Sequence, residues 1–241
     1  MTIKLLNSLL LAAGAVLSVL ERGPQPSKNR TRGRNLPATS RDVADDTTRR
    51  YLTYVVLPLW GVTGFLDWLW HRQTKIETTS GVKESILHLI MISEVGIPVL
   101  TGLFLEMNAG ALALMGAGWL MHELTVAWDV NYSISRRKIL PREQHTHSYQ
   151  QTIPFDVVAI FACLHPEQFM ALFGLGPEKP DFKLRFRKSP APLKHFAAIV
   201  GGAGLISVVP HVEELWRCYR AERDGLAKRD IPQCARELYA S

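Results

Sequence analysis

Carboxylate and imidazole side chains recur at a spacing of four residues within apolar segments of this 241-residue chain. Positions four apart lie on the same face of a helix, which advances about 100° per residue. Each such pair can therefore present one oxygen and one nitrogen donor to a neighbouring helix. The pairs are Asp67 and His71, Glu84 and His88, and Glu143 and His147. His122 and Asp129, seven positions apart, return to nearly the same face after two turns.

Donors of these two kinds, without a thiolate, favour iron or manganese, with zinc as an alternative. Carboxylates can also bridge two cations, as they do in the di-metal centres of helical bundles. We therefore predict two metal ions, with iron preferred, and no other cofactor. The predicted ligands are Asp67, His71, Glu84, His88, His122, Asp129, Glu143 and His147. His122 and Asp129 are about 10 Å apart along their helix, so only one of them is expected to bind directly.

Several other polar residues accompany this set. Any single carboxylate–histidine pair could equally be an ordinary ion pair within one helix. The prediction of a metal centre therefore depends on the recurrence of such pairs in several helices. Glu94 is interpreted as a buried acid that bridges metals, relays protons or forms a local hydrogen bond, and His145 is expected to be exposed. His211, with Glu214 close by, is a candidate extra ligand. Candidate supporting residues behind the ligands are Gln150, Gln151, Tyr132 and Glu123.

The apolar residues fall in long runs separated by short basic connectors, a pattern typical of membrane proteins. We predict an all-α, polytopic membrane bundle of about six transmembrane helices, with a four-helix metal-binding layer near one membrane face. Gly201, Gly202 and Gly204 are expected to allow close helix contact. The expected spans are residues 5–20, 51–71, 84–105, 108–130, 142–164 and 193–216.

The chain order also predicts its division into regions. Residues 1–21 form a transmembrane span or signal anchor, with a cleaved signal peptide as the alternative. Residues 22–50 form a polar loop or arm, residues 51–216 the metal-binding bundle, and residues 217–241 a charged tail. Short connectors join the second span to the third and the fourth to the fifth. The paired residues at those four helix ends are therefore expected to converge on one side of the membrane.

The net charge of +6 is distributed over several loops, as expected for segments that meet anionic lipid headgroups. No nucleic-acid-binding module is recognisable, so nucleic acid is not an expected partner. Lysine and arginine number 14 in the loops of one side and 13 on the other, so charge does not orient the chain. A retained first span with a cytoplasmic start would place the metal face in the cytoplasm, and the expected location is a bacterial inner membrane.

The ligand inventory resembles, in a general way, that of integral-membrane di-iron hydroxylases and desaturases. Their dense HxxxH and HxxHH boxes are absent, and the nearest match is His145-Thr146-His147. The Glu-x-x-His motif of ferritin-like proteins is one residue shorter than the spacing found here. The resemblance implies a dinuclear iron centre.

These observations favour a membrane oxidoreductase that activates oxygen and acts on a lipid or other apolar substrate, supplied with electrons by a donor protein. A zinc-dependent intramembrane hydrolase is one alternative, although no GxSxG nucleophile motif is present. A haem-binding or accessory subunit without catalytic activity is another. The sequence assigns no catalytic residue beyond the metal ligands.

Overall fold

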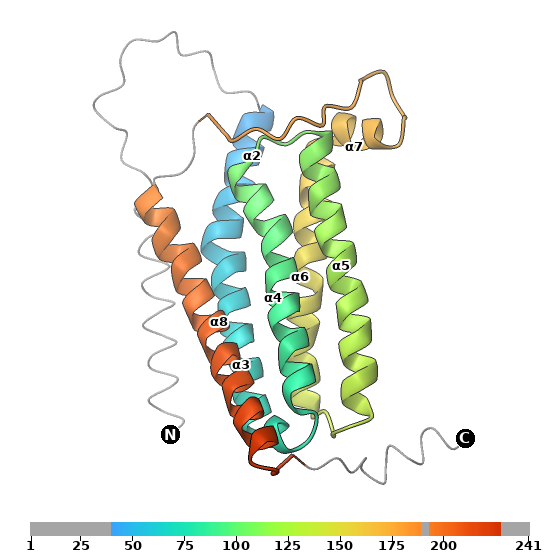
Figure 1. The fold of residues 1–241 in the computed structure, drawn as a ribbon. Helices are drawn as coiled ribbons and strands as arrows, with labels where there is room; N and C mark the ends of the chain where they lie inside the picture. The colour runs from blue at the N-terminus through green and yellow to red at the C-terminus, as the bar shows by residue number, and fades with distance from the viewer. Residues whose placement is uncertain (1–39, 189–192, 228–241) are drawn as a thin grey trace. The chain divides into compact units, whose positions relative to one another are not determined.

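The computed structural model describes residues 40–188 and 193–227, and these residues are helical apart from the connections (Figure 1). The chain divides into two units, residues 1–46 and 47–241. Of the first unit, the described part is the start of helix α2 (Ser40–Tyr51). The predicted span at residues 1–21 lies outside the described residues, as do most of the polar arm and the end of the tail.

Five long helices of the second unit run side by side (Figure 1). They are α3 (Leu57–Thr74), α4 (Gly81–Phe104), α5 (Ala109–Ile134), α6 (Pro141–Leu164) and α8 (Leu193–Arg223). A π-helix, η1 (Leu52–Val56), leads into α3, and a 3-10 turn, η2 (Ile76–Thr78), links α3 to α4. The short helix α7 (Pro166–Leu172) follows α6. The described residues thus confirm the predicted all-α class.

Local sequence signals explain where the helices begin and end. Lys75 adopts a left-handed conformation that ends α3. The Asn108 side chain accepts a hydrogen bond from the Ala111 amide and caps the start of α5. Pro141 and Pro166 occupy the first positions of α6 and α7, where a backbone N–H has no partner within the helix and its absence in proline costs no hydrogen bond. The chain bends by 106° between α6 and α7.

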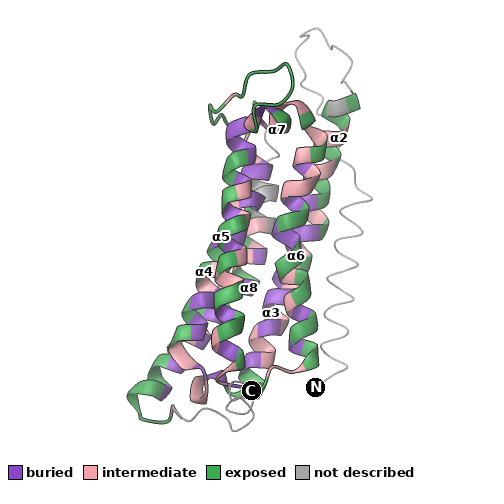
Figure 2. Cartoon of the chain, turned by 90° about the vertical axis from the view of Figure 1, so that its right-hand side faces the viewer, coloured by how far each residue is buried: buried purple, intermediate pink, exposed green. Residues whose placement is uncertain are grey.

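Buried residues occur along the whole length of the bundle (Figure 2), but its two halves differ in character. The half built from the start of α3 and the ends of α4 and α6 is apolar, with Leu52, Val99, Met115, Val157 and Phe161 in one cluster. The opposite half buries ionisable residues. The apolar half holds the helices together, while the other half forms the candidate site.

Two described helical segments are long and apolar enough to cross a membrane, Asp42–Thr74 and Gly81–Phe104. The bent pair α6 and α7 makes a third if it counts as one span. These helices are consistent with a membrane protein, whereas the number of six spans remains a prediction. Helices α5 and α8 are not among the candidate spans found within the described residues.

Helices α3 and α8 pack closely, but the small residues at their contact are not the glycines singled out in the sequence. A Cβ atom built on Gly201, Gly202 or Gly204 meets nothing within 4 Å among the described residues. The described residues therefore show no close helix contact at these three glycines, and the expectation stays a prediction. The contact lies instead at Gly61 and Gly64 of α3, which face Ala203 and Ser207 of α8.

Candidate metal centre

Five helices bring ionisable residues to the same end of the second unit (Figure 1). The end of α3 and the start of α4 meet there with the end of α5, the start of α6 and the later part of α8. Their side chains, all buried except the partly exposed His147, form three groups, and within each group the donor atoms lie within 4.8 Å of one another. The groups are Asp67, His71, Glu143 and His147; Glu84, His88 and Asp129; and Asp67, His71, His88 and His211. Seven of the eight predicted ligands are thus brought together, and His122 is not among them.

Asp67 lies at the middle of the first group. His147 Nε2 is 2.8 Å from Asp67 Oδ1, and His71 Nε2 is 3.5 Å from the same oxygen. His71 Nε2 is also 3.2 Å from Glu143 Oε1. One imidazole nitrogen therefore faces two carboxylates, an arrangement suited to a shared cation.

His88 occupies the corresponding position in the second group. Its Nε2 is 3.8 Å from Asp129 Oδ2 and 3.9 Å from Glu84 Oε1. The rings of His71 and His88 are stacked, with centroids 4.5 Å apart and planes inclined by 12°. That separation is close to the roughly 3.5–4 Å between the ions of two-metal sites. The two groups are therefore near enough to form one dinuclear centre.

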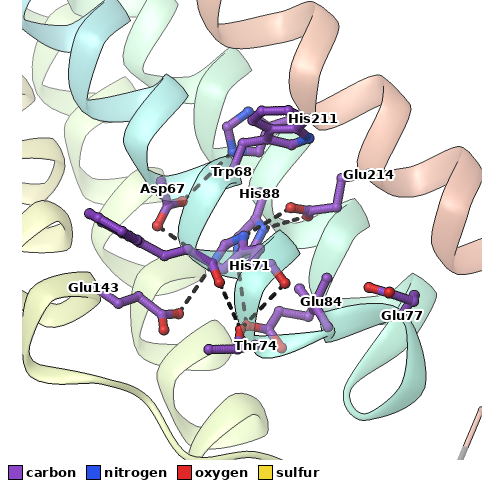
Figure 3. Close-up of polar contacts among 12 residues, drawn as sticks. Asp67, Trp68, His71, Thr74, Glu77, Glu84, His88, Glu143, His211 and Glu214 are labelled. Atoms are coloured by element: carbon purple, nitrogen blue, oxygen red, sulfur yellow. Dashed lines mark hydrogen bonds and ion pairs between the residues drawn. The ribbon is translucent and has the colours of Figure 1, made fainter. Parts of the chain in front are cut away.

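Glu214 of α8 orients both stacked rings (Figure 3). Its Oε2 lies 2.9 Å from His71 Nδ1, and its Oε1 lies 3.2 Å from His88 Nδ1. A carboxylate accepts both hydrogen bonds when each ring carries its proton on Nδ1. Both Nε2 atoms are then free to bind a metal, and a carboxylate behind the ligand is the usual support of a metal-binding histidine.

His211 adds a third imidazole held in the same way. Its Nδ1 donates to the Ser207 carbonyl oxygen at 2.7 Å, one helical turn earlier. Its Nε2 is 3.7 Å from Asp67 Oδ2. The backbone of α8 therefore fixes the tautomer of His211 and directs its second nitrogen at the centre.

Buried atoms at the centre lack hydrogen-bond partners within the described part of the chain. They include His71 Nε2, His88 Nε2 and Glu143 Oε2. Buried polar atoms are nearly always satisfied in folded proteins, so such exceptions need an explanation. Metal coordination by these three atoms supplies one.

Arg137, in the connection between α5 and α6, closes the centre on one side. Its Nε donates to Glu84 Oε1 at 3.0 Å, and its Nη2 donates to both Glu84 and Glu143. Burial disfavours the charged guanidinium, but Glu84 and Glu143 outweigh it and raise the pKa of Arg137 above its ordinary value. Arg137 therefore remains a cation in the cluster.

The cluster has a large excess of negative charge when its histidines are neutral. Asp67, Glu84, Asp129, Glu143 and Glu214 are at most 4% exposed, and Arg137 is the cation that pairs with two of them. Five carboxylates and one guanidinium leave four negative charges. Uncompensated buried charge is strongly unfavourable. Two divalent cations would balance it, as would protons on the four neighbouring imidazoles.

The remaining predicted residues lie apart from this cluster. His122 Nδ1 is 3.9 Å from Glu94 Oε2, deeper along α5. The Tyr132 hydroxyl donates to the Ser80 carbonyl, and Gln151 donates to Glu123. These three contacts involve no residue of the three donor groups.

The groups that support the ligands are Glu214 and Arg137. The sequence indicated Glu214 only as a companion of a candidate extra ligand, His211. It indicated Arg137 only as part of a basic loop. Comparison of the chain with protein families, with characterised proteins and with solved structures gave no match.

Proposed function

We propose that this protein is an integral membrane metalloprotein with a dinuclear, iron-binding histidine–carboxylate centre. The observation that carries the proposal is the pairing of His71 and His88 on Glu214, which leaves two stacked Nε2 atoms directed at carboxylates. In a structural ion-pair network the same Nε2 atoms would instead carry protons, so metal content separates the two arrangements. The charge balance supports two divalent ions, and the absence of a cysteine donor from the described groups supports iron or manganese.

The reaction class that this centre suits is oxygen-dependent oxidation of an apolar substrate. Such a centre, when loaded, supplies the two-electron chemistry that activates oxygen. In a hydroxylation, one oxygen atom enters a C–H bond and the other leaves as water, with two electrons and two protons from a donor protein. The chain itself contributes the oriented imidazoles, the charge of Arg137 and exclusion of water from buried carboxylates.

The surroundings support an apolar substrate and a bilayer. Leu120, Leu124 and Trp128 form an exposed apolar stripe at four-residue spacing on α5. Leu205 and Val209 add an exposed apolar surface on α8. We infer that these surfaces face lipid, from which a substrate can enter between the helices.

Metal content of the purified protein tests the proposal directly. We expect two irons per chain in wild type, and a loss of at least one in His147→Ala, because His147 lies 2.8 Å from the central Asp67. His145→Ala is the matched control, since His145 is exposed on the same helix and packs its ring on Tyr149. Elemental analysis of both variants and wild type measures this.

Three outcomes would contradict the proposal. Wild-type protein without bound metal would refute the metal centre. Equal metal content in both variants would refute the role of His147. Bound zinc that is indifferent to oxygen and reductant would favour the hydrolase alternative.

A further inference from the structure

A pocket adjoins the candidate metal centre and extends from it into the bundle. Five of the residues that line it belong to the donor groups, namely Asp67, His88, Asp129, His147 and His211. Its other walls include the apolar side chains Trp60, Met91, Ile92, Val95 and Val126. A molecule in this pocket would therefore reach the metal centre with one end and contact apolar walls along its length.

One wall of the pocket carries a polar group that the proposed metal centre does not use. His122 lines the pocket and is 3% exposed. Within residues 40–188 and 193–227, neither of its ring nitrogens makes a hydrogen bond of good geometry, although the Met91 backbone interacts with the ring. A buried imidazole without well-formed hydrogen bonds is costly, so this side chain points to a ligand.

Glu94 lies on the Nδ1 side of His122, at a longer distance than that between Glu214 and His71. Glu94 Oε2 is 3.9 Å from His122 Nδ1. Glu94 Oε1 accepts a hydrogen bond of 2.8 Å from the Thr125 hydroxyl, which fixes the carboxylate. This carboxylate favours the tautomer with the proton on Nδ1, and Nε2 of His122 is then available as an acceptor.

The helices set the depth of this pair relative to the centre. His122 precedes Asp129 by seven residues on α5, and Glu94 follows His88 by six on α4. At about 1.5 Å per residue, both displacements are roughly 10 Å along the helix axis. They point the same way, since α4 leaves the metal end of the bundle and α5 returns to it (Figure 1).

We propose that the pocket binds an elongated apolar molecule whose hydroxyl group is held by His122, about 10 Å from the metal centre. Glu94 is a positioning residue that orients the His122 ring. This inference rests on the proposed function, because the metal centre would react with the other end of the bound molecule. It adds the class of substrate to that function. The substrate is an aliphatic chain with a hydroxyl group several carbons from the position that reacts.

Binding of decanol and decane to the metal-loaded protein in nanodiscs tests this inference. The variant Val126→Trp, whose larger side chain obstructs the pocket, is measured in identical nanodiscs and gives the uptake of each probe by the bilayer. Subtracting that uptake from the value for wild type leaves the binding to the pocket. We expect wild type to bind decanol roughly tenfold more tightly than decane, the equivalent of one buried hydrogen bond. His122→Phe should lose that preference while decane binding and metal content remain, and Glu94→Gln should reduce it. His145→Phe is the matched control and should keep it.

The possible failures are distinguishable. Equal affinities for the two probes in wild type, or an unchanged preference in His122→Phe, would overturn the inference while leaving the metal centre intact. Loss of metal in His122→Phe would also overturn it, because His122 would then be a metal ligand. A preference for decanol in a wild-type protein that binds no metal would instead refute the proposed function.

Discussion

Glu214 determines the protonation pattern of two imidazoles that come from different helices. Its two oxygens lie 2.9 and 3.2 Å from the Nδ1 atoms of His71 and His88. As a carboxylate it accepts from both rings, and it is completely buried. The direction of both Nε2 atoms toward the other carboxylates follows from this one side chain.

Replacement of Glu214 by glutamine should weaken metal binding by about 10- to 100-fold, the range found when groups supporting a metal ligand are removed. An amide has only one oxygen acceptor, so one ring loses its partner and can turn or change tautomer. Iron(II) titration against a competing chelator without oxygen measures the affinity. The helical content should remain that of wild type, because the size of the side chain is unchanged.

The adjacent Glu213→Gln variant is the matched control. Glu213 accepts a hydrogen bond from Trp68 Nε1 at 2.8 Å and lies 3.5 Å from Arg72, at the surface of the bundle. Its replacement should leave iron affinity within about twofold of wild type, as expected for an exposed charge pair. Equal losses in the two variants would show that Glu214 acts only through general charge.

At the residue scale, sequence spacing identified ligand candidates but not the groups that support them. A spacing of four residues is a property of one helix, so Glu84 with His88 was predictable. The partners of Glu214 are 143 and 126 positions away in the chain, and no local pattern records such contacts. Arg137 lies in a basic connector, whose sequence likewise records no contact with Glu84 or Glu143. His122 is a residue type that binds metal, so it was a reasonable candidate ligand. The spacing within its own helix could not show that it lies deeper in the bundle than the donors of the other helices.

Helices α3 and α8 approach each other through small residues next to the site. A Cβ atom on Gly64 would lie 2.3 Å from Ser207 Oγ, and one on Gly61 would lie 3.4 Å from Ala203 Cα. One turn further along, the same helices carry Asp67 and His211, whose donor atoms are 3.7 Å apart. The close approach therefore sets the distance between these donors.

The variant Gly64→Val should push α3 and α8 apart without removing any donor atom. We expect overpacking of about 1–3 kcal/mol and loss of part of the bound iron. Gly201→Val is the control, because no atom in the described part of the chain lies within 4 Å of a Cβ atom built at that position. Thermal unfolding in nanodiscs and elemental analysis measure both effects. Full iron occupancy in Gly64→Val would show that the donors tolerate a change in helix separation.

At the element scale, helix positions were predictable and membrane spans were less so. The predicted segment 142–164 nearly coincides with α6, and 84–105 with α4, because proline and turn residues mark the ends. Mean hydropathy is a poorer guide for α5. That helix buries His122 and Asp129 and exposes Leu120 and Leu124. The polar residues of its buried face therefore lower the mean hydropathy of the whole helix, although its exposed face is apolar. Contacts of small residues such as Gly64 depend on the partner helix and cannot be read from one segment.

Across the whole molecule, an apolar half of the bundle supports a half that buries five carboxylates. Burying charges of one sign is unfavourable unless cations accompany them. Arg137 supplies one, and four negative charges remain to be balanced. Either metal ions or protons on His71, His88, His147 and His211 can do this, and the two solutions exclude each other because a metal-bound imidazole nitrogen carries no proton.

Metal binding should therefore release protons in measurable number. We expect the uptake of two iron(II) ions at neutral pH to expel about two to four protons per chain, because the cations replace protons held on the imidazoles. Calorimetric titration without oxygen, in two buffers of different ionisation enthalpy, gives this number from the difference in heat. Cys163→Ser, which alters an exposed thiol away from the donor groups, should release as many protons as wild type. Binding of iron with no proton release would mean that the buried carboxylates are balanced in some other way, and the charge argument for a dinuclear centre would fail.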